Sequence, residues 1–238
     1  KKLKCLEHKN ISDFEEDNND CPTLESSKYK EFVKNCNNKK NIADFENDLC
    51  HYSLNDKLIK NYENKFLGEC KVLPNIKIFE NNKCDLSEDE DVIKQRKFLI
   101  DSCNLKQNIN DFEINNCHES NNNILKLKYN SFNQSCKNYL TYKNYKSFES
   151  NKCNKKSGGF LNYNEFLKSC KIKSNINDFE LSKCHTSSNS QLITKYNQLK
   201  KVCNDKTNIK SFEDSKCHFS NKVTTKYNQL KKVCNSKT

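Results

Sequence analysis

Cysteine is the residue of this chain with the widest chemistry, because a thiolate can attack a substrate or bind a metal and two thiols can form a disulfide. The 238 residues include 15 Cys at regular spacing, while only 34% of the residues are hydrophobic. Regular cysteines in a chain with so few apolar residues predict a disulfide scaffold made in an oxidising compartment. An oxidised cysteine offers no thiolate, so this prediction argues against cysteine catalysis.

Histidine next to cysteine raises the question of a metal site. Four of the five His directly follow a Cys, namely His51, His118, His185 and His218. A zinc site would require Cys and His at ligand spacing, such as two close pairs, and the sequence has no C-x-x-C. We therefore expect no metal and no other cofactor, and interpret each His as the C-terminal residue of a short helix.

The sequence also lacks other catalytic patterns. It has only 3 Gly, and it shows no Gly-rich phosphate loop, no Ser/His/Asp set and no paired carboxylates. We therefore predict that the chain is not an enzyme. The net charge of +11 suggests a nucleic-acid binder, but Arg96 is the only arginine, and nucleic-acid surfaces usually use arginine. A basic nucleic-acid binder is the weaker alternative, whereas attraction to an acidic surface or partner stays open.

The cysteines lie on a phrase that returns seven times: Asn, an apolar residue, two spacers, Phe-Glu, and a Cys shortly after. The first copy runs from Asn10 to Cys21, and a second cysteine, Cys36, closes the unit. The closing cysteines divide the chain into repeats 6–36, 37–70, 71–103, 104–136, 137–170, 171–203 and 204–234. These units are 31 to 34 residues long, which is typical of helical-repeat arrays. We therefore predict that residues 1–238 form a single array.

Each phrase predicts a short helix, and the arm between its two cysteines predicts a longer one. In the fourth repeat Asn108 is a good N-cap, and Ile109 and Phe112 fall on one helical face. From Tyr129 to Cys136 the apolar residues are spaced three and four apart, as on one face of an α-helix. Arg96 takes the place of this tyrosine in the third repeat. The predicted fold class is all-α, a disulfide-stapled, solenoid-like array of about seven short-helix/long-helix units.

Two disulfide schemes fit the spacing. The gap from a closing cysteine to the next phrase cysteine is 14 residues in five cases, and this constancy favours pairing across it. The favoured scheme pairs Cys5–Cys21, Cys36–Cys50, Cys70–Cys84, Cys103–Cys117, Cys136–Cys153, Cys170–Cys184 and Cys203–Cys217, and leaves Cys234 unpaired. The rival scheme pairs across the longer arm, as in Cys21–Cys36, and leaves Cys5 over. Spacing alone does not decide between them.

The disulfide scaffold also predicts a secreted, extracellular protein. The sequence has no apolar run long enough to span a bilayer and no signal peptide, and it contains no Met. We therefore expect a mature or trimmed product without a membrane span. Residues 235–238 resemble the start of another phrase and predict a further, truncated repeat, which suggests self-association through Cys234.

The arm from one cysteine through a tyrosine to the next resembles the cysteine–tyrosine–cysteine motif of the aphid bicycle proteins. It occurs as Cys21…Tyr29…Cys36, Cys117…Tyr129…Cys136, Cys153…Tyr163…Cys170, Cys184…Tyr196…Cys203 and Cys217…Tyr227…Cys234. Bicycle proteins are secreted salivary proteins thought to act as effectors inside plants, so the resemblance implies a secreted effector. This chain has seven units instead of the usual pair, and its Asn/Phe-Glu phrase has no match in that motif. In composition, the Asn/Lys bias is similar to malaria-parasite surface antigens.

These observations predict a secreted, non-enzymatic repeat protein that binds host macromolecules through a lateral surface, as an effector or a surface antigen. The expected partner is a host protein or another extracellular macromolecule, and the sequence names no partner-binding residue. The odd cysteine motivates a second hypothesis, a segment of a disulfide-cross-linked extracellular polymer such as a salivary sheath, silk or coat.

Overall fold

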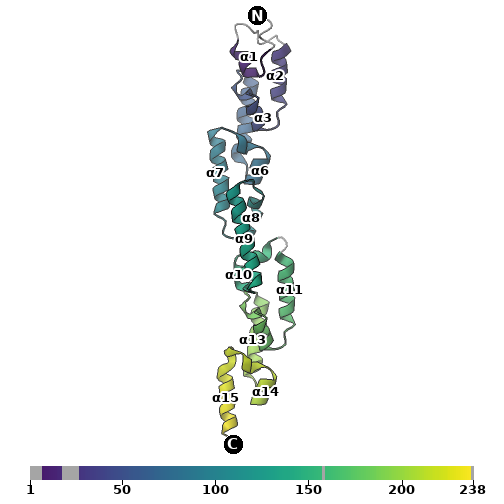
Figure 1. Ribbon diagram of the computed structural model, residues 1–238, viewed down its shortest axis with the longest axis vertical. Coiled ribbons are helices and arrows are strands. Elements are labelled where there is room, and N and C mark those ends of the chain that lie inside the picture. The colour runs from purple at the N-terminus through teal and green to yellow at the C-terminus, as the bar shows by residue number, and fades with distance from the viewer. Residues whose placement is uncertain (1–6, 18–26, 157–158, 237–238) are drawn as a thin grey trace. The chain divides into compact units, whose positions relative to one another are not determined.

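The computed structural model describes residues 7–17, 27–156 and 159–236, which confirm the all-α fold class because they form helices and turns and no strand. The chain forms two compact units. Figure 1 labels helices of both units in chain order. Unit 1 comprises residues 1–106 and 112–128, and unit 2 comprises residues 107–111 and 129–238. Within each unit, short helices that follow a phrase asparagine alternate with longer arms that end near a closing cysteine.

The elements up to residue 119 are α1 (Ile11–Glu16), α2 (Ser27–Asn37), α3 (Ile42–Asn47), η2 (Cys50–Tyr52), α4 (Asp56–Lys60), η3 (Asn61–Leu67), α5 (Gly68–Val72), α6 (Ile76–Asn81), η4 (Cys84–Leu86), α7 (Glu90–Asn104), α8 (Ile109–Ile114) and η5 (Cys117–Glu119). The later elements are α9 (Asn123–Thr141), α10 (Tyr145–Ser150), η6 (Cys153–Lys155), α11 (Gly159–Lys171), α12 (Ile176–Leu181), η7 (Cys184–Thr186), α13 (Ser190–Asn204), α14 (Ile209–Asp214), η8 (Cys217–Phe219), η9 (Asn221–Val223) and α15 (Thr224–Asn235). The η elements are 3-10 turns, except η3, which is π-helical.

The phrase asparagine begins each short helix. The side-chain oxygen of Asn41 accepts a hydrogen bond from the Asp44 amide at 3.0 Å, and the Asn41 side-chain amide donates to the Asp44 carboxylate at 2.8 Å. This cap satisfies a backbone donor that the first helical turn leaves unpaired. The same cap oxygen accepts at Asn10, Asn75, Asn108, Asn144, Asn175 and Asn208. The predicted N-caps are therefore confirmed.

The phrase phenylalanine anchors each short helix in the core. Phe14, Phe45, Phe79, Phe112, Phe148, Phe179 and Phe212 are each at most 1% exposed. Phe45, for example, stacks on Tyr62 with ring centroids 5.7 Å apart and contacts Phe66 at 5.0 Å. A helix of 6 residues is not stable alone in water, so this packing holds it in place.

In six of the seven repeats, within the described residues, a residue in the left-handed conformation follows the short helix and lies directly before the phrase cysteine. These residues are Leu49, Lys83, Asn116, Lys152, Lys183 and Lys216, with φ between 53° and 58°. None of them is glycine, and this conformation costs a residue with a side chain about 1 kcal/mol or more. The reversal leads the chain into the 3-10 turn that begins with the phrase cysteine.

Within the described residues, six disulfide bonds join the closing cysteine of one repeat to the phrase cysteine of the next. They are Cys36–Cys50, Cys70–Cys84, Cys103–Cys117, Cys136–Cys153, Cys170–Cys184 and Cys203–Cys217, with Cα–Cα distances of 5.6 to 5.7 Å. Cys234 is free and exposed, and the expected Cys5–Cys21 pair lies outside the described residues. A closed loop of this length contributes about 3 kcal/mol in the chain-entropy model, so the staples supplement a sparse core.

The longer arm of the second repeat has a π-helical turn. Tyr62 lies eight residues before its closing cysteine, whereas Tyr29 and Tyr163 lie seven residues before theirs. The π-helix of Asn61–Leu67 accommodates one extra residue without ending the helix. Tyr62 therefore still stacks on Phe45 despite its shifted position.

Candidate binding surface

A buried carboxylate joins consecutive repeats. Glu15 accepts hydrogen bonds from the Tyr29 hydroxyl of its own repeat at 3.1 Å and from the Ser53 hydroxyl of the next repeat at 2.8 Å. The Leu54 amide donates to the other carboxylate oxygen at 2.5 Å. Glu15 is only 4% exposed, and a buried carboxylate requires several donors to offset its lost hydration. We call this arrangement of Glu, Tyr and Ser the clasp.

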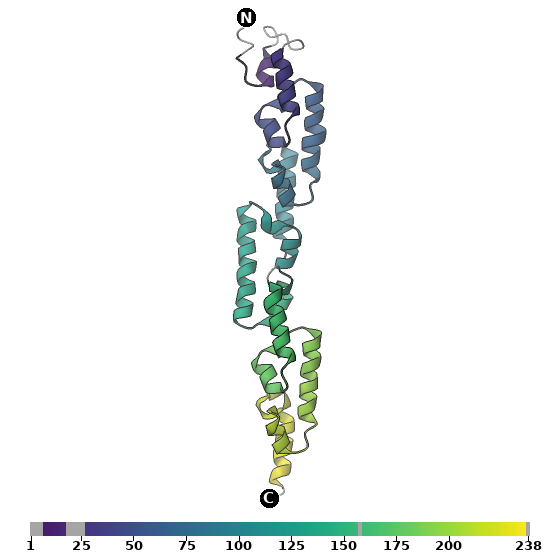
Figure 2. The same cartoon turned by 90° about the vertical axis from the view of Figure 1, so that its right-hand side faces the viewer.

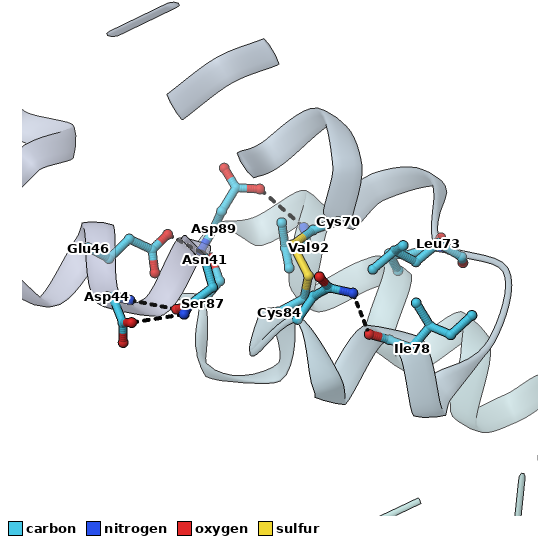
Figure 3. The surroundings of a disulfide bond; sticks show 12 residues. Asn41, Asp44, Glu46, Cys70, Leu73, Ile78, Cys84, Ser87, Asp89 and Val92 are labelled. Carbon is cyan, nitrogen blue, oxygen red and sulfur yellow. Dashed lines mark hydrogen bonds between the residues drawn. A yellow bond between two sulfur atoms is a disulfide. The ribbon is translucent and has the colours of Figure 1, made fainter. Parts of the chain in front are cut away.

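The clasp recurs in both units. Glu46 accepts from Tyr62 and Ser87 at 2.6 and 2.7 Å, Glu180 accepts from Tyr196 and Ser220 at 2.5 and 2.8 Å, and Glu149 accepts from Tyr163, Ser187 and the Ser188 amide. Figure 3 shows Glu46 directed toward Ser87, beside the Cys70–Cys84 disulfide. The clasp and the staple therefore hold the same junction between repeats.

The third repeat has the glutamate–serine contact of the clasp but no tyrosine. Glu80 is 8% exposed and accepts from the Ser120 hydroxyl at 2.6 Å and from the Asn121 amide at 2.7 Å. Asp85 follows the phrase cysteine here, where His follows it in four other repeats. Burial raises the pKa of the Asp85 carboxyl, and the Arg96 charge opposes this shift. In this repeat Arg96 stands at the tyrosine position, and Asp85 stands at the position where four other repeats have histidine. Two residues of opposite charge thus replace the two aromatic rings.

The clasp holds its tyrosines in the protonated form. Burial, together with the hydrogen bond to Glu149, raises the pKa of Tyr163 to about 12. The same two causes, with burial the larger, raise the pKa values of Tyr62 and Tyr196. Each phenol therefore keeps the proton that it donates to the carboxylate at neutral pH.

Ion pairs form a second contact between repeats. Lys83, Lys152 and Lys216 lie 2.8, 2.9 and 3.4 Å from Asp44, Asp111 and Asp178 of the preceding repeat. The lysine is the main cause that lowers the pKa of Asp44 and of Asp111, whereas for Asp178 the capping Asn175 is the main cause. Such exposed pairs contribute little stability. In the described chain these ion pairs join the second repeat to the third, the fourth to the fifth and the sixth to the seventh. The pattern of ion pairs thus recurs every two repeats.

The histidines that follow phrase cysteines contact tyrosine rings. The rings of His51, His185 and His218 lie 5.5, 5.8 and 6.1 Å from those of Tyr62, Tyr196 and Tyr227. Burial lowers the pKa values of His51 and His185, so both are uncharged at neutral pH. In the part of the chain that the structure describes, no group of three or more His, Cys, Asp or Glu is arranged to hold a metal ion.

Unit 1 carries two adjoining hollows that share Leu49 and Tyr52. Leu54 lines the first and Leu86 lines the second, and we call the four apolar residues together the apolar groove. Tyr52, Leu54 and Leu86 are 63%, 70% and 61% exposed. Carboxylates surround the groove at Asp13, Glu16, Glu88 and Asp89. The arrangement can receive a segment that combines apolar and basic side chains.

The sequence prediction does not include the clasp, although two signals for it are present. A glutamate follows the phenylalanine in all seven phrases, and serine stands three residues after the phrase cysteine in five repeats. In the fifth repeat Lys156 takes the place of this serine, contacts Asn133 and lies 5.8 Å from the centre of the Tyr129 ring. The apolar groove has no such repeated signal, because Tyr52 and Leu86 occupy equivalent positions with different residue types.

None of the helices that the structure describes is both long and apolar enough to cross a membrane. Comparison of the chain with protein-family models, with curated proteins and with solved structures gave no match.

Proposed function

We propose that this chain is an extracellular, non-enzymatic binding protein that holds a segment of a partner protein in the apolar groove of unit 1. The observation that carries the proposal is the groove itself, where Tyr52, Leu54 and Leu86 are each more than 60% exposed. Large apolar side chains exposed next to one another mark interaction sites. Six intramolecular disulfides support the extracellular location.

The residues that the repeats share are used to hold the array together, which supports binding rather than catalysis. The phrase asparagine caps a helix, the phenylalanine fills the core and the cysteine forms a staple. The phrase glutamate is engaged by tyrosine and serine, as at Glu46. What differs from repeat to repeat is the outer surface, and this is the part of a repeat protein that meets a partner.

The chemistry around the groove defines the partner. Asp13, Glu16 and Glu88 are exposed carboxylates beside apolar side chains, so complementarity favours lysine or arginine next to leucine-like residues. His51 adds no positive charge at neutral pH, because burial lowers its pKa. A host protein, as the bicycle resemblance implies, is the expected source of such a segment.

Synthetic peptides test this proposal on the disulfide-intact chain. A peptide that alternates leucine and lysine should bind, with NMR shift changes at Tyr52 and Leu86, whereas a leucine–glutamate peptide should leave these signals unchanged. The double variant Tyr52→Ser/Leu86→Ser should weaken binding at least tenfold. Phe219→Ser is the matched control, because Phe219 has the equivalent position in unit 2 and is 61% exposed. Equal binding by wild type and the double variant would contradict the proposal.

The polymer hypothesis retains one supporting arrangement. Cys234 is free and exposed at the position where six other closing cysteines bond to the next phrase cysteine. Within the described residues Glu213 accepts only from Tyr227, at 2.7 Å, so its clasp has no serine. The first phrase of another copy would complete the disulfide if its Cys21 bonded to Cys234 instead of to Cys5, which would leave Cys5 as the free thiol. On a non-reducing gel of native material, a ladder that Cys234→Ser abolishes supports a polymer, and a monomer favours the binding protein.

A further inference from the structure

The two units carry very different charge. Unit 2 contains 21 lysines and eight carboxylates, which gives a net charge of +13. Unit 1 contains 21 basic residues and 23 carboxylates, which gives −2. The excess positive charge of the chain therefore resides in unit 2, in a part of the molecule outside the apolar groove.

Five of the eight carboxylates in unit 2 are already engaged within it, among them Glu213, which accepts a hydrogen bond from Tyr227. Glu149 and Glu180 accept hydrogen bonds in clasps, and Asp111 and Asp178 contact their capping asparagines and a lysine. These carboxylates are all counted in the net charge of +13, so 13 lysine charges in unit 2 remain uncompensated. The surface of unit 2 is therefore strongly cationic.

Most lysines of unit 2 have no carboxylate partner. Among its described lysines, only Lys152 and Lys216 form ion pairs. An exposed lysine stands two residues before the closing cysteine in three successive repeats, at Lys168, Lys201 and Lys232. The same position holds Lys34, Gly68 and Asp101 in unit 1. The fold that the repeats share therefore does not require a lysine at this position.

The long helices that carry these three lysines lie on different sides of unit 2. In Figure 1, α11 and α15 lie to opposite sides, and α13 is between them. In Figure 2, the view turned by 90°, α13 in turn lies to one side. The three helices that carry the lysines are therefore arranged around the unit and do not share one plane. A flat anionic membrane would meet only one of the three helices, whereas a flexible chain of charges can follow all of them.

We propose that unit 2 binds a linear sulfated polysaccharide along this path of lysines. The ligand class follows from three features: a dense, unpaired lysine surface, a non-planar arrangement, and an oxidising compartment, in which sulfated and carboxylated polysaccharides are the common linear polyanions. Nucleic acid fits less well, because unit 2 has no arginine for bidentate contacts. Tyr142 and Phe219 are also the only large aromatic side chains exposed in its described part for base stacking.

Heparin serves as the probe for the disulfide-intact full chain. The triple variant Lys168→Gln/Lys201→Gln/Lys232→Gln should lower heparin affinity at 150 mM NaCl by about tenfold, because three ion contacts of about 0.5 kcal/mol each are lost. The matched control is Lys34→Gln/Lys60→Gln/Lys97→Gln, which removes three exposed lysines on the long arms of unit 1 and should change affinity less than twofold. Thermal unfolding of both variants verifies that the fold is retained.

Further ligands separate the classes of polyanion. Hyaluronan carries carboxylates without sulfates, single-stranded DNA carries phosphates, and phosphatidylserine vesicles present a planar anionic surface. Tighter binding of heparin than of all three supports the proposal. Equal or tighter binding of DNA or of vesicles overturns it, as does equal loss of affinity in the two triple variants. The groove variant Tyr52→Ser/Leu86→Ser should retain heparin affinity. If the groove proposal is wrong, the heparin result therefore still stands.

Discussion

Units 1 and 2 share an interior and differ in their exteriors. Both contain the buried phenylalanine, the capped short helix, the staple and the clasp. Unit 1 exposes Tyr52, Leu54 and Leu86 among carboxylates, whereas unit 2 exposes unpaired lysines and has a net charge of +13. One frame can thus support two surfaces, because the contacts that hold the repeats together do not use the outward positions.

If the contacts that hold the repeats together are the same in both units, removal of one disulfide should lower the free energy of unfolding equally in each unit. Cys70→Ala/Cys84→Ala in unit 1 and Cys170→Ala/Cys184→Ala in unit 2 both open a loop with a sequence separation of 14. Each pair should lower the free energy of unfolding by about 3 kcal/mol. Hydrogen exchange with mass spectrometry should locate the loss in the unit that carries the change. Equal loss of protection in both units would mean that they are not separate.

The clasp offers a comparison between a complete junction and an incomplete one. Glu80→Ala in unit 1 leaves the buried Ser120 hydroxyl and the Asn121 amide without their acceptor, and should cost about 2 kcal/mol. Glu213→Ala in unit 2 removes an exposed carboxylate that serves Tyr227 alone, and should cost about 0.5 kcal/mol. Urea unfolding measures both. Equal costs would show that the serine of the next repeat adds nothing.

Alkaline pH should weaken the clasps that contain tyrosine. The pKa of Tyr163 is raised to about 12 from 10.0, so the folded state keeps the proton that the unfolded chain loses. The stability that this shift contributes is complete below pH 10 and is lost as pH rises from 10 to 12. Urea unfolding across this range should show a shallower decline for Tyr163→Phe. Exchange protection around Glu80, whose repeat has Arg96 instead of tyrosine, should decline less than that around Glu149.

The sequence predicts features that form within one helix and leaves out the clasp and groove contacts between repeats. The Asn caps, the buried phenylalanines and the all-α class follow from local spacing, because a cap and an apolar stripe act within one helix. The clasp joins residues 38 to 41 positions apart, such as Glu15 and Ser53, and a carboxylate contact at this separation has no local periodicity. The groove depends on how Leu49, Tyr52 and Leu86 from adjacent repeats come together, which only the fold determines.

Salt should affect the two units differently, although the expected change is small. Raising NaCl from about 10 to about 150 mM shortens the screening length from about 30 to about 8 Å. Repulsion among the lysines of unit 2 then weakens, and its amides should gain about 1 kcal/mol of protection in hydrogen exchange on the full chain. Unit 1, with a net charge of −2 and ion pairs such as Lys71–Asp91, should change little or lose slightly. An equal gain of amide protection in both units would indicate that salt stabilises the chain in general. Repulsion among the lysines of unit 2 would then not destabilise the fold, and an anionic ligand would have no such repulsion to relieve.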